Sequence, residues 1–125
     1  MILLDTHAFL WFLTDDSRLP AKIKDKIETD KDVFVSIASF WEIAIKNSLG
    51  KLQLPVSITE MMEVCRSLLI TVLPINAAQL ERLKDLPWIH RDPFDRLLIC
   101  QALEKDLTLI TVDSNIVKYD VKTDW

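Results

Sequence analysis

The chain has 125 residues, of which 50% are hydrophobic and 27% charged, and its net charge at pH 7 is −4. This length and composition fit one globular domain over residues 1–125 and exclude a disordered chain. The single glycine excludes glycine-rich phosphate loops, which need several glycines close together. The acidic balance argues against binding of duplex DNA through bulk charge.

Cysteine content and hydropathy set the expected location. Two cysteines, Cys65 and Cys100, are too few for a disulfide scaffold or a four-thiolate zinc site, so a reduced cytoplasmic setting is expected. No apolar run reaches the roughly 18 residues of a membrane span. The N-terminal stretch is apolar but lacks a positively charged region, so we expect neither a signal peptide nor a membrane partner.

Short apolar runs alternate with helical patterns along the N-terminal half. The patterns predict a strand at 1–4, a short buried helix at 6–13, an exposed amphipathic helix at 19–28, a strand at 33–36 and a mostly buried helix at 38–49 that Gly50 ends. Trp41 and Trp88 could stack on nucleic-acid bases, but packing in the core is the preferred interpretation of Trp41.

The same alternation continues in the C-terminal half. It predicts a helix at 58–68, a strand at 69–75, a helix at 77–86 capped by Asn76, a helix from Pro93 to about Lys105 capped by Asp92, a strand at 108–112, a short helix at 114–119 and an edge strand at 121–123. Alternating strands and helices favour right-handed crossovers. The predicted fold class is α/β, a three-layer α/β/α sandwich with a short, mostly parallel central sheet.

Several acids fall where this fold would gather them. Asp5 and Asp113 end predicted strands, Asp92 and Asp95 open a helix, and Glu42 lies in the helix after the second strand. Ligands of open α/β sheets bind outside the carboxyl ends of the strands. We therefore expect these carboxylates to share one cleft.

Each acid also has a purely structural interpretation. Asp5, Asp92 and Asp113 could cap helices, and Ser39 with Glu42 matches a capping box. Gathered together, however, buried carboxylates repel one another unless a cation is present. An all-oxygen site suits Mg²⁺ or Mn²⁺, which support phosphoryl chemistry.

Basic side chains lie near the expected cleft. Lys46, Lys51, Arg91 and Arg96 could hold phosphates. Lys46 could instead pair with Glu42 one helical turn away, and Arg96 could form a structural pair with an acid. His90 is interpreted as a surface or hydrogen-bonded histidine rather than a ligand.

Four ordered blocks of the sequence resemble the PIN-domain ribonucleases, specifically the VapC-like toxins of type II toxin–antitoxin pairs. The blocks are LLDTHAFLW at 3–11, SIASFWEIAIKNSLGKLQLP at 36–55, HRDPFDRLLICQAL at 90–103 and LTLITVDSNIVKY at 107–119. They span nearly the whole chain in the expected order.

The resemblance implies a PIN-like fold and a metal-dependent endoribonuclease that uses Mg²⁺ or Mn²⁺. It carries the metal-binding and catalytic roles onto Asp5, Glu42, Asp95 and Asp113. Thr6 and Thr111 match small polar positions beside these acids, and Asp92 is an accessory carboxylate. Expected contacts to RNA or antitoxin come from Lys46, Arg91 and Arg96.

The resemblance also implies an RNA substrate, a cognate antitoxin protein and a homodimer. The apolar helix at 58–68, with Met61 and Met62, is the expected dimer surface. Two alternatives stay open. A catalytically silent PIN-like domain would bind a protein and use its acids only as caps. A receiver-like phosphoacceptor is disfavoured because Asp5 has no adjacent acid and no lysine ends the fourth strand.

Overall fold

A parallel sheet forms the centre of the molecule. The computed structural model describes residues 1–125. Its strands take the order β3-β2-β1-β4-β5, and every pairing is parallel. The strands are β1 (Ile2–Leu4), β2 (Val33–Ser36), β3 (Ile70–Leu73), β4 (Thr108–Ile110) and β5 (Thr123–Asp124). In the central strand β1, Leu3 lies between Phe34 of β2 and Leu109 of β4.

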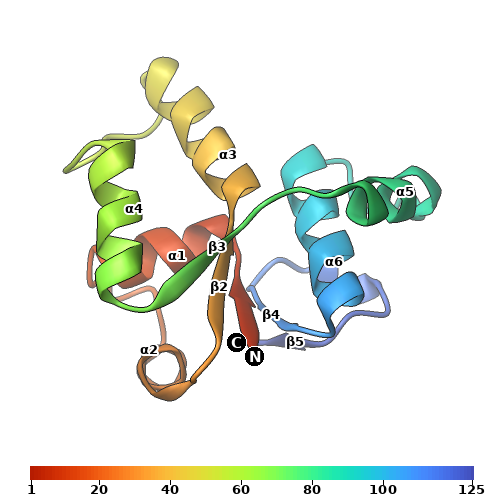
Figure 1. Ribbon diagram of the computed structural model, residues 1–125, viewed down its shortest axis with the longest axis horizontal. Coiled ribbons are helices and arrows are strands. Elements are labelled where there is room, and N and C mark those ends of the chain that lie inside the picture. Colours follow the sequence, from red (N-terminus) through yellow and green to blue (C-terminus); the bar gives the residue numbers. More distant parts are fainter.

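Helices cover both faces of this sheet, as Figure 1 shows with α1, α2 and α4 on one side and α5 and α6 on the other. They are α1 (Thr6–Leu13), α2 (Ala21–Thr29), α3 (Ile37–Ser48), α4 (Ile58–Ser67), α5 (Ala77–Asp85) and α6 (Pro93–Lys105), with a 3₁₀ turn at Ile116–Lys118. None of these helices has the combined length and apolar character that a membrane crossing requires. The expected three-layer α/β/α sandwich is confirmed.

Alternation along β1 divides the core in two. Ile2 and Leu4 belong to one buried cluster with α1, α2 and α4, whereas Leu3 belongs to a second cluster with α6. Successive strand side chains point to opposite faces, which explains why this strand is apolar at every position. Helix α3 contacts both α1 and α6 and so lies across the edge of the sheet where β1 ends.

Strands β1, β3 and β4 are shorter than the sequence predicts, whereas β2 spans the predicted residues 33–36. β3 begins after Leu69, whose φ of +59° turns the chain, and it ends before Pro74, which has no N–H for a sheet hydrogen bond. β4 stops at Ile110 opposite the last residue of β1, because β1 itself ends where Asp5 begins a helix. The last strand forms at Thr123–Asp124 rather than at 121–123.

Two interpretations of α3 are wrong. The helix is capped by Ser36, whose Oγ accepts from the N–H of Ala38 at 3.1 Å, and Ser39 lies inside the helix. Trp41 is 60% exposed and packs edge-on against Phe94 instead of entering the core. The helix buries its other side because that side contacts both α1 and α6.

Candidate active site

The strand order changes direction between β1 and β4, and the candidate site lies at this point. The chain moves outward from β1 to β2 and β3, and then returns to add β4 on the other side of β1. Crevices outside the carboxyl ends of strands at such switch points are the usual ligand sites of open α/β sheets. Asp5 follows β1 and Asp113 follows β4, so both side chains lie at this crevice.

Asp5 caps α1 and is almost fully buried. Its side chain is 5% exposed, and Oδ1 accepts a hydrogen bond from the N–H of Ala8 at 2.8 Å. Burial raises the pKa of this carboxyl, and the nearby charge of Asp113 raises it further, although the hydroxyl of Thr111 and the N–H of Ala8 oppose the shift. The structural interpretation as a cap is therefore confirmed, and it leaves the second carboxylate oxygen for other contacts.

Glu42 is also buried and is held on both of its oxygens. Its side chain is 6% exposed. The hydroxyl of Thr6 donates to Oε1 at 2.7 Å, and Nζ of Lys46 lies 2.8 Å from Oε2. Lys46 thus forms the pair one helical turn away that the sequence allowed. These contacts fix the Glu42 carboxylate beside the crevice.

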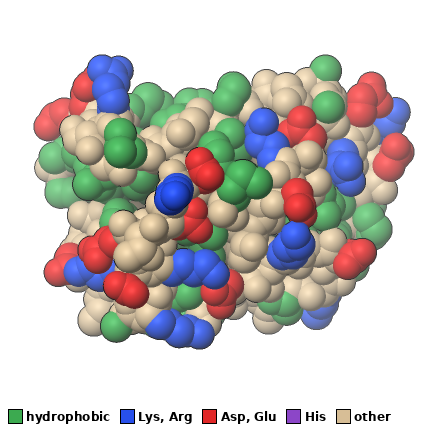
Figure 2. Space-filling model, turned by 60° about the horizontal axis from the view of Figure 1, so that its bottom comes forward, with side chains coloured by type: hydrophobic (Ala, Val, Ile, Leu, Met, Phe, Trp, Pro, Cys, Tyr) green, Lys and Arg blue, Asp and Glu red, His purple; other side chains and the backbone are tan.

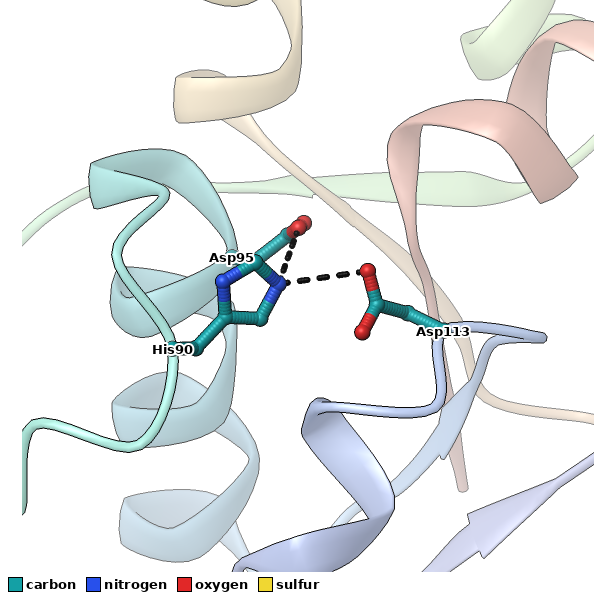
Figure 3. Close-up of side chains that lie close together, drawn as sticks. All are labelled: His90, Asp95 and Asp113. Atoms are coloured by element: carbon teal, nitrogen blue, oxygen red, sulfur yellow. Dashed lines mark hydrogen bonds and ion pairs between the residues drawn. The ribbon is translucent and has the colours of Figure 1, made fainter.

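His90 joins two of the acids, as Figure 3 shows. Its Nε2 lies 3.0 Å from Oδ2 of Asp95 and 3.2 Å from Oδ2 of Asp113. Its Nδ1 accepts a hydrogen bond from the N–H of Asp92 at 3.2 Å. Because Nδ1 is the acceptor, Nε2 carries the proton and donates it toward the two carboxylates.

The site shifts the pKa values of Asp95 and Asp113 in opposite directions. Burial is the largest cause that raises the pKa of Asp95 to about 7, and the charges of Asp92, Asp5 and Glu42 add to it while His90 opposes it. For Asp113, burial raises the pKa, but the N–H groups of two following residues and His90 outweigh burial and lower it. At neutral pH, Asp113 is therefore ionised while Asp95 retains part of a proton.

Asp92 prepares the start of α6. Its Oδ1 accepts from the N–H groups of Phe94 and Asp95, at 2.8 and 3.1 Å, and Pro93 occupies the first turn. A proline fits there because its missing N–H has no partner in a first turn anyway. Since Asp92 supplies the cap, the Asp95 side chain is left free to face the crevice.

The structure corrects the expectation that Arg96 contacts RNA or antitoxin. Arg96 is 3% exposed. Its guanidinium donates to the carbonyls of Pro87 and Leu86 at 2.9 and 3.0 Å and to the Tyr119 hydroxyl at 3.3 Å, and it lies 3.7 Å from the centre of the Trp88 ring. Its partners are carbonyls rather than an acid, so its role is to hold the loop before α6.

The donor set fits a hard divalent cation. Carboxylate oxygens of Asp95 and Asp113 lie within 4.8 Å of each other and of Nε2 of His90, which carries a proton and so offers no lone pair to a metal in this tautomer. Asp5 and Glu42 act on the pKa of Asp95, which places their charges nearby. Oxygen-rich, mostly anionic sites suit Mg²⁺ and Mn²⁺. A bound cation would favour the ionised form of Asp95 and so oppose the effects of burial and of the neighbouring acids on its pKa.

His90 is the site residue that the sequence interpretation undervalued. The sequence predicts a surface or hydrogen-bonded imidazole, and the structure shows that its hydrogen-bond partners are two acids of the crevice. The position of His90 two residues before the Asp92 cap is the sequence feature that indicates this placement. A short cap loop holds the imidazole close to the acid in the first turn of α6.

Comparisons with known proteins agree with this architecture. A sequence model described as PIN domain matches residues 2–122. No curated protein sequence matches the chain. A toxin–antitoxin complex from Klebsiella pneumoniae has a similar structure, with a TM-score of 0.66 and 16% identity over 100% of this chain and 97% of that chain. The crystal structure of VapBC2 from Rickettsia felis bound to a promoter DNA fragment is also similar, with a TM-score of 0.70 and 14% identity over 99% of this chain and 98% of that chain. These likenesses show a shared fold.

The raised pKa of Asp95 predicts a pH dependence of stability in the absence of metal. A carboxyl whose folded pKa exceeds its unfolded value binds more protons when folded, so stability falls as pH rises between about 4 and 7. In EDTA, Asp95→Asn should stabilise the protein above pH 7 relative to the original chain, and this advantage should shrink toward pH 4.5. Urea unfolding across this range measures it. Parallel curves for the two proteins would contradict the assignment.

Arg96 and Arg91 form a matched pair for testing the buried guanidinium. Arg96→Ala leaves buried carbonyls without donors, at about 1–3 kcal/mol each, so the free energy of unfolding should fall by about 3 kcal/mol. Arg91→Ala removes an exposed side chain and should change it by no more than about 0.5 kcal/mol. Urea denaturation compares them, and equal effects would refute the structural role of Arg96.

Proposed function

The chain belongs to the PIN domain family, and from this premise we propose that residues 1–125 act as one nuclease domain, a metal-dependent endoribonuclease that serves as the toxin of a toxin–antitoxin pair. The observation that carries the proposal is the convergence of four carboxylates, Asp5, Glu42, Asp95 and Asp113, at the switch point of the sheet. Such a set is unfavourable without a cation and suits one that activates water.

Each acid has a defined part in this proposal. Asp5, Asp95 and Asp113 hold the divalent cation, Mg²⁺ or Mn²⁺, and Glu42 completes the acidic site. The chemistry supplied by such a cation is activation of water and neutralisation of charge on the phosphodiester. In the metal-free chain the pKa of Asp95 is raised to about 7, and a cation held by this carboxylate would favour its ionised form.

The surrounding side chains position these groups. Thr6 donates to Glu42 and so fixes the direction of its carboxylate. Thr111 lies beside Asp5 and accepts from the N–H of Asp113 at 3.1 Å, which connects the ends of β1 and β4. Lys46 and the exposed Arg91 are the basic groups that remain to contact RNA phosphates or an antitoxin.

A protein partner is part of the proposal. Of the solved structures of similar fold, the one from Klebsiella pneumoniae is described as a toxin–antitoxin complex and the one from Rickettsia felis as VapBC2. An antitoxin that covers the acid site would keep the nuclease inactive until the antitoxin is removed. A ribonuclease of this kind would act in the cytoplasm, where its RNA substrate is.

A second candidate function, protein binding without catalysis, has one observation in its favour. Asp5, Asp92 and Asp113 all accept backbone hydrogen bonds at the starts of helical segments, as a set of caps would. Caps need no divalent ion. Metal dependence therefore separates the two functions.

The nuclease proposal predicts metal-dependent stability and cleavage. Millimolar Mg²⁺ or Mn²⁺ should raise the melting temperature, since a ligand at a hundredfold excess over its Kd stabilises the fold by about 2.7 kcal/mol. RNA cleavage should stop in EDTA. Asp5→Asn should abolish cleavage yet keep the fold, because an asparagine oxygen can still accept from the N–H of Ala8.

Asp85→Asn, a change of one exposed acid outside the site, is the control and should cleave RNA like the original chain. Gel analysis of labelled RNA and thermal melting give both readouts. Undiminished cleavage by Asp5→Asn would refute the assignment of Asp5. If Mg²⁺ and Mn²⁺ do not stabilise the original chain and the chain cleaves no RNA, protein binding without catalysis is favoured.

The homodimer part of the proposal needs a revised surface. Met61 is 2% exposed and packs in the core, so it is unavailable to a partner. The exposed apolar residues near the end of α4 are Val64, Leu68 and Leu69, and Met62 is half-buried. Apolar side chains gathered on one surface often mark an interface.

Light scattering at micromolar concentration should give twice the single-chain mass of 14.5 kDa. Leu68→Lys places a charge in the expected interface and should shift the protein toward monomer. Leu80→Lys, at an equally exposed leucine of α5, is the control and should leave the dimer intact. If both variants stay dimeric, the surface lies elsewhere, and a monomeric original chain would refute the dimer.

A further inference from the structure

A cavity of about 490 Å³ opens beside the acid site, between α1 and the loop that follows α3. Its size falls within the range of roughly 300–1,000 Å³ that small ligands occupy. Thr6, His7 and Trp11 line it from α1, and residues 51–55 line it from the loop. The loop is held in place because Nδ2 of Asn47 donates to the carbonyl of Leu52 at 2.9 Å.

The cavity adjoins the acid site through two side chains that contact Glu42. Thr6 and Lys46 both line the cavity, and both contact the Glu42 carboxylate, at 2.7 and 2.8 Å. A group held in the cavity would therefore lie next to the acids.

The cavity has a positive lining in a chain whose net charge is −4. Its only acid, Asp16, is held by the guanidinium of Arg18 at 2.8 Å. Lys46 is shared with Glu42, but Lys51 is exposed and takes part in no ion pair. Elsewhere the charges are mixed: Figure 2, viewed from the α2 side, shows basic and acidic side chains interspersed.

The end of α3 places Lys51 at this position. Gly50 has a φ of +70°, which glycine adopts without strain, and the N–H of Lys51 donates to the carbonyl of Lys46 at 2.9 Å. This turn brings Lys51 back beside the last turn of the helix. The two lysines thus line the same cavity.

Aromatic rings supply the opposite wall. The rings of His7 and Trp11 are stacked, with centres 5.6 Å apart and an angle of 30° between their planes. Arg18 covers Trp11 at 4.8 Å. Cations that can hold a phosphate together with aromatic surfaces that can stack on a base are the two features of sites for single-stranded nucleic acid.

We propose that this cavity is a substrate subsite that binds one unpaired nucleotide of the RNA beside the scissile phosphate. Lys51, with Lys46, holds the phosphate of that nucleotide, and the exposed His7 ring, backed by Trp11, stacks on its base. A base must leave its duplex to enter such a cavity, so the subsite selects single-stranded RNA. The inference rests on the proposed function, because it assigns the substrate of the same acid site.

The test compares two lysines of similar setting. Lys51 and Lys31 are both exposed, follow a helix and take part in no ion pair, but only Lys51 lines the cavity. Each is changed to Ala in Asp5→Asn protein with Mg²⁺, and fluorescence anisotropy measures the binding of a labelled single-stranded RNA. Lys51→Ala should weaken binding about fivefold at 0.1 M salt and lower the slope of log Kd against log salt by about 0.7, the value for one lost phosphate contact. Lys31→Ala should change neither quantity.

A further variant separates stacking from charge. His7→Ala should weaken binding by about fivefold or more, the range seen for one stacked base, while the salt slope stays unchanged. A blunt RNA duplex of the same sequence should bind more weakly than the single strand.

If Lys51→Ala binds RNA like Lys31→Ala, with the same salt slope, the subsite is refuted and the cavity is left to a protein partner. Cleavage by the protein with Asp5 intact is measured separately. If the protein cleaves RNA but Lys51→Ala does not weaken RNA binding, the nuclease proposal holds and the subsite is refuted. If Lys51→Ala weakens RNA binding but the protein cleaves no RNA, the subsite holds and the nuclease proposal is refuted.

Discussion

The carboxylates of Asp5, Glu42, Asp95 and Asp113 repel one another at one edge of the sheet. Asp5 and Glu42 are almost fully buried there, and Asp95 and Asp113 are partly exposed. Burial weakens the screening that water provides, so each charge acts strongly on its neighbours. Burial is the largest cause of the pKa of about 7 at Asp95, and the charges of Asp92, Asp5 and Glu42 raise it further. Holding an ionised carboxylate there therefore costs free energy. Two apolar clusters, one on each face of the sheet, stabilise the fold against this cost.

Hydrogen bonds from N–H groups at the starts of helical segments hold Asp5 and Asp113 in defined positions. Oδ1 of Asp113 accepts from the N–H groups of Asn115 and Ile116, while Oδ2 faces His90. Asp5 likewise uses Oδ1 for the N–H of Ala8. Oδ1 of each carboxylate is therefore structural, and in Asp113 the other oxygen faces His90 in the crevice. The structural and functional interpretations of these acids, which compete when the sequence is considered alone, are both satisfied by the same side chain.

Local patterns explain how much of this was predictable. The strand at 33–36, the helix at 6–13 and the Asp92–Pro93 start of α6 follow from short-range rules of alternation and capping, and they place the acids at strand and helix ends. Long-range packing decided the rest. Ser36 rather than Ser39 caps α3 because the helix begins directly at the end of β2. The burial of Arg96 depends on a loop folding back over α6, which no spacing in the sequence reveals.

The most direct test of a cation-dependent acid site is the proton balance of metal binding. Calorimetric titration of Mn²⁺ into the protein, in buffers of different ionisation enthalpy, measures how many protons each bound ion displaces. Because the pKa of Asp95 is raised, binding at pH 7 should release protons, and Asp95→Asn should release fewer of them. Absence of Mn²⁺ binding, or binding that releases no proton from the original chain, would contradict the account.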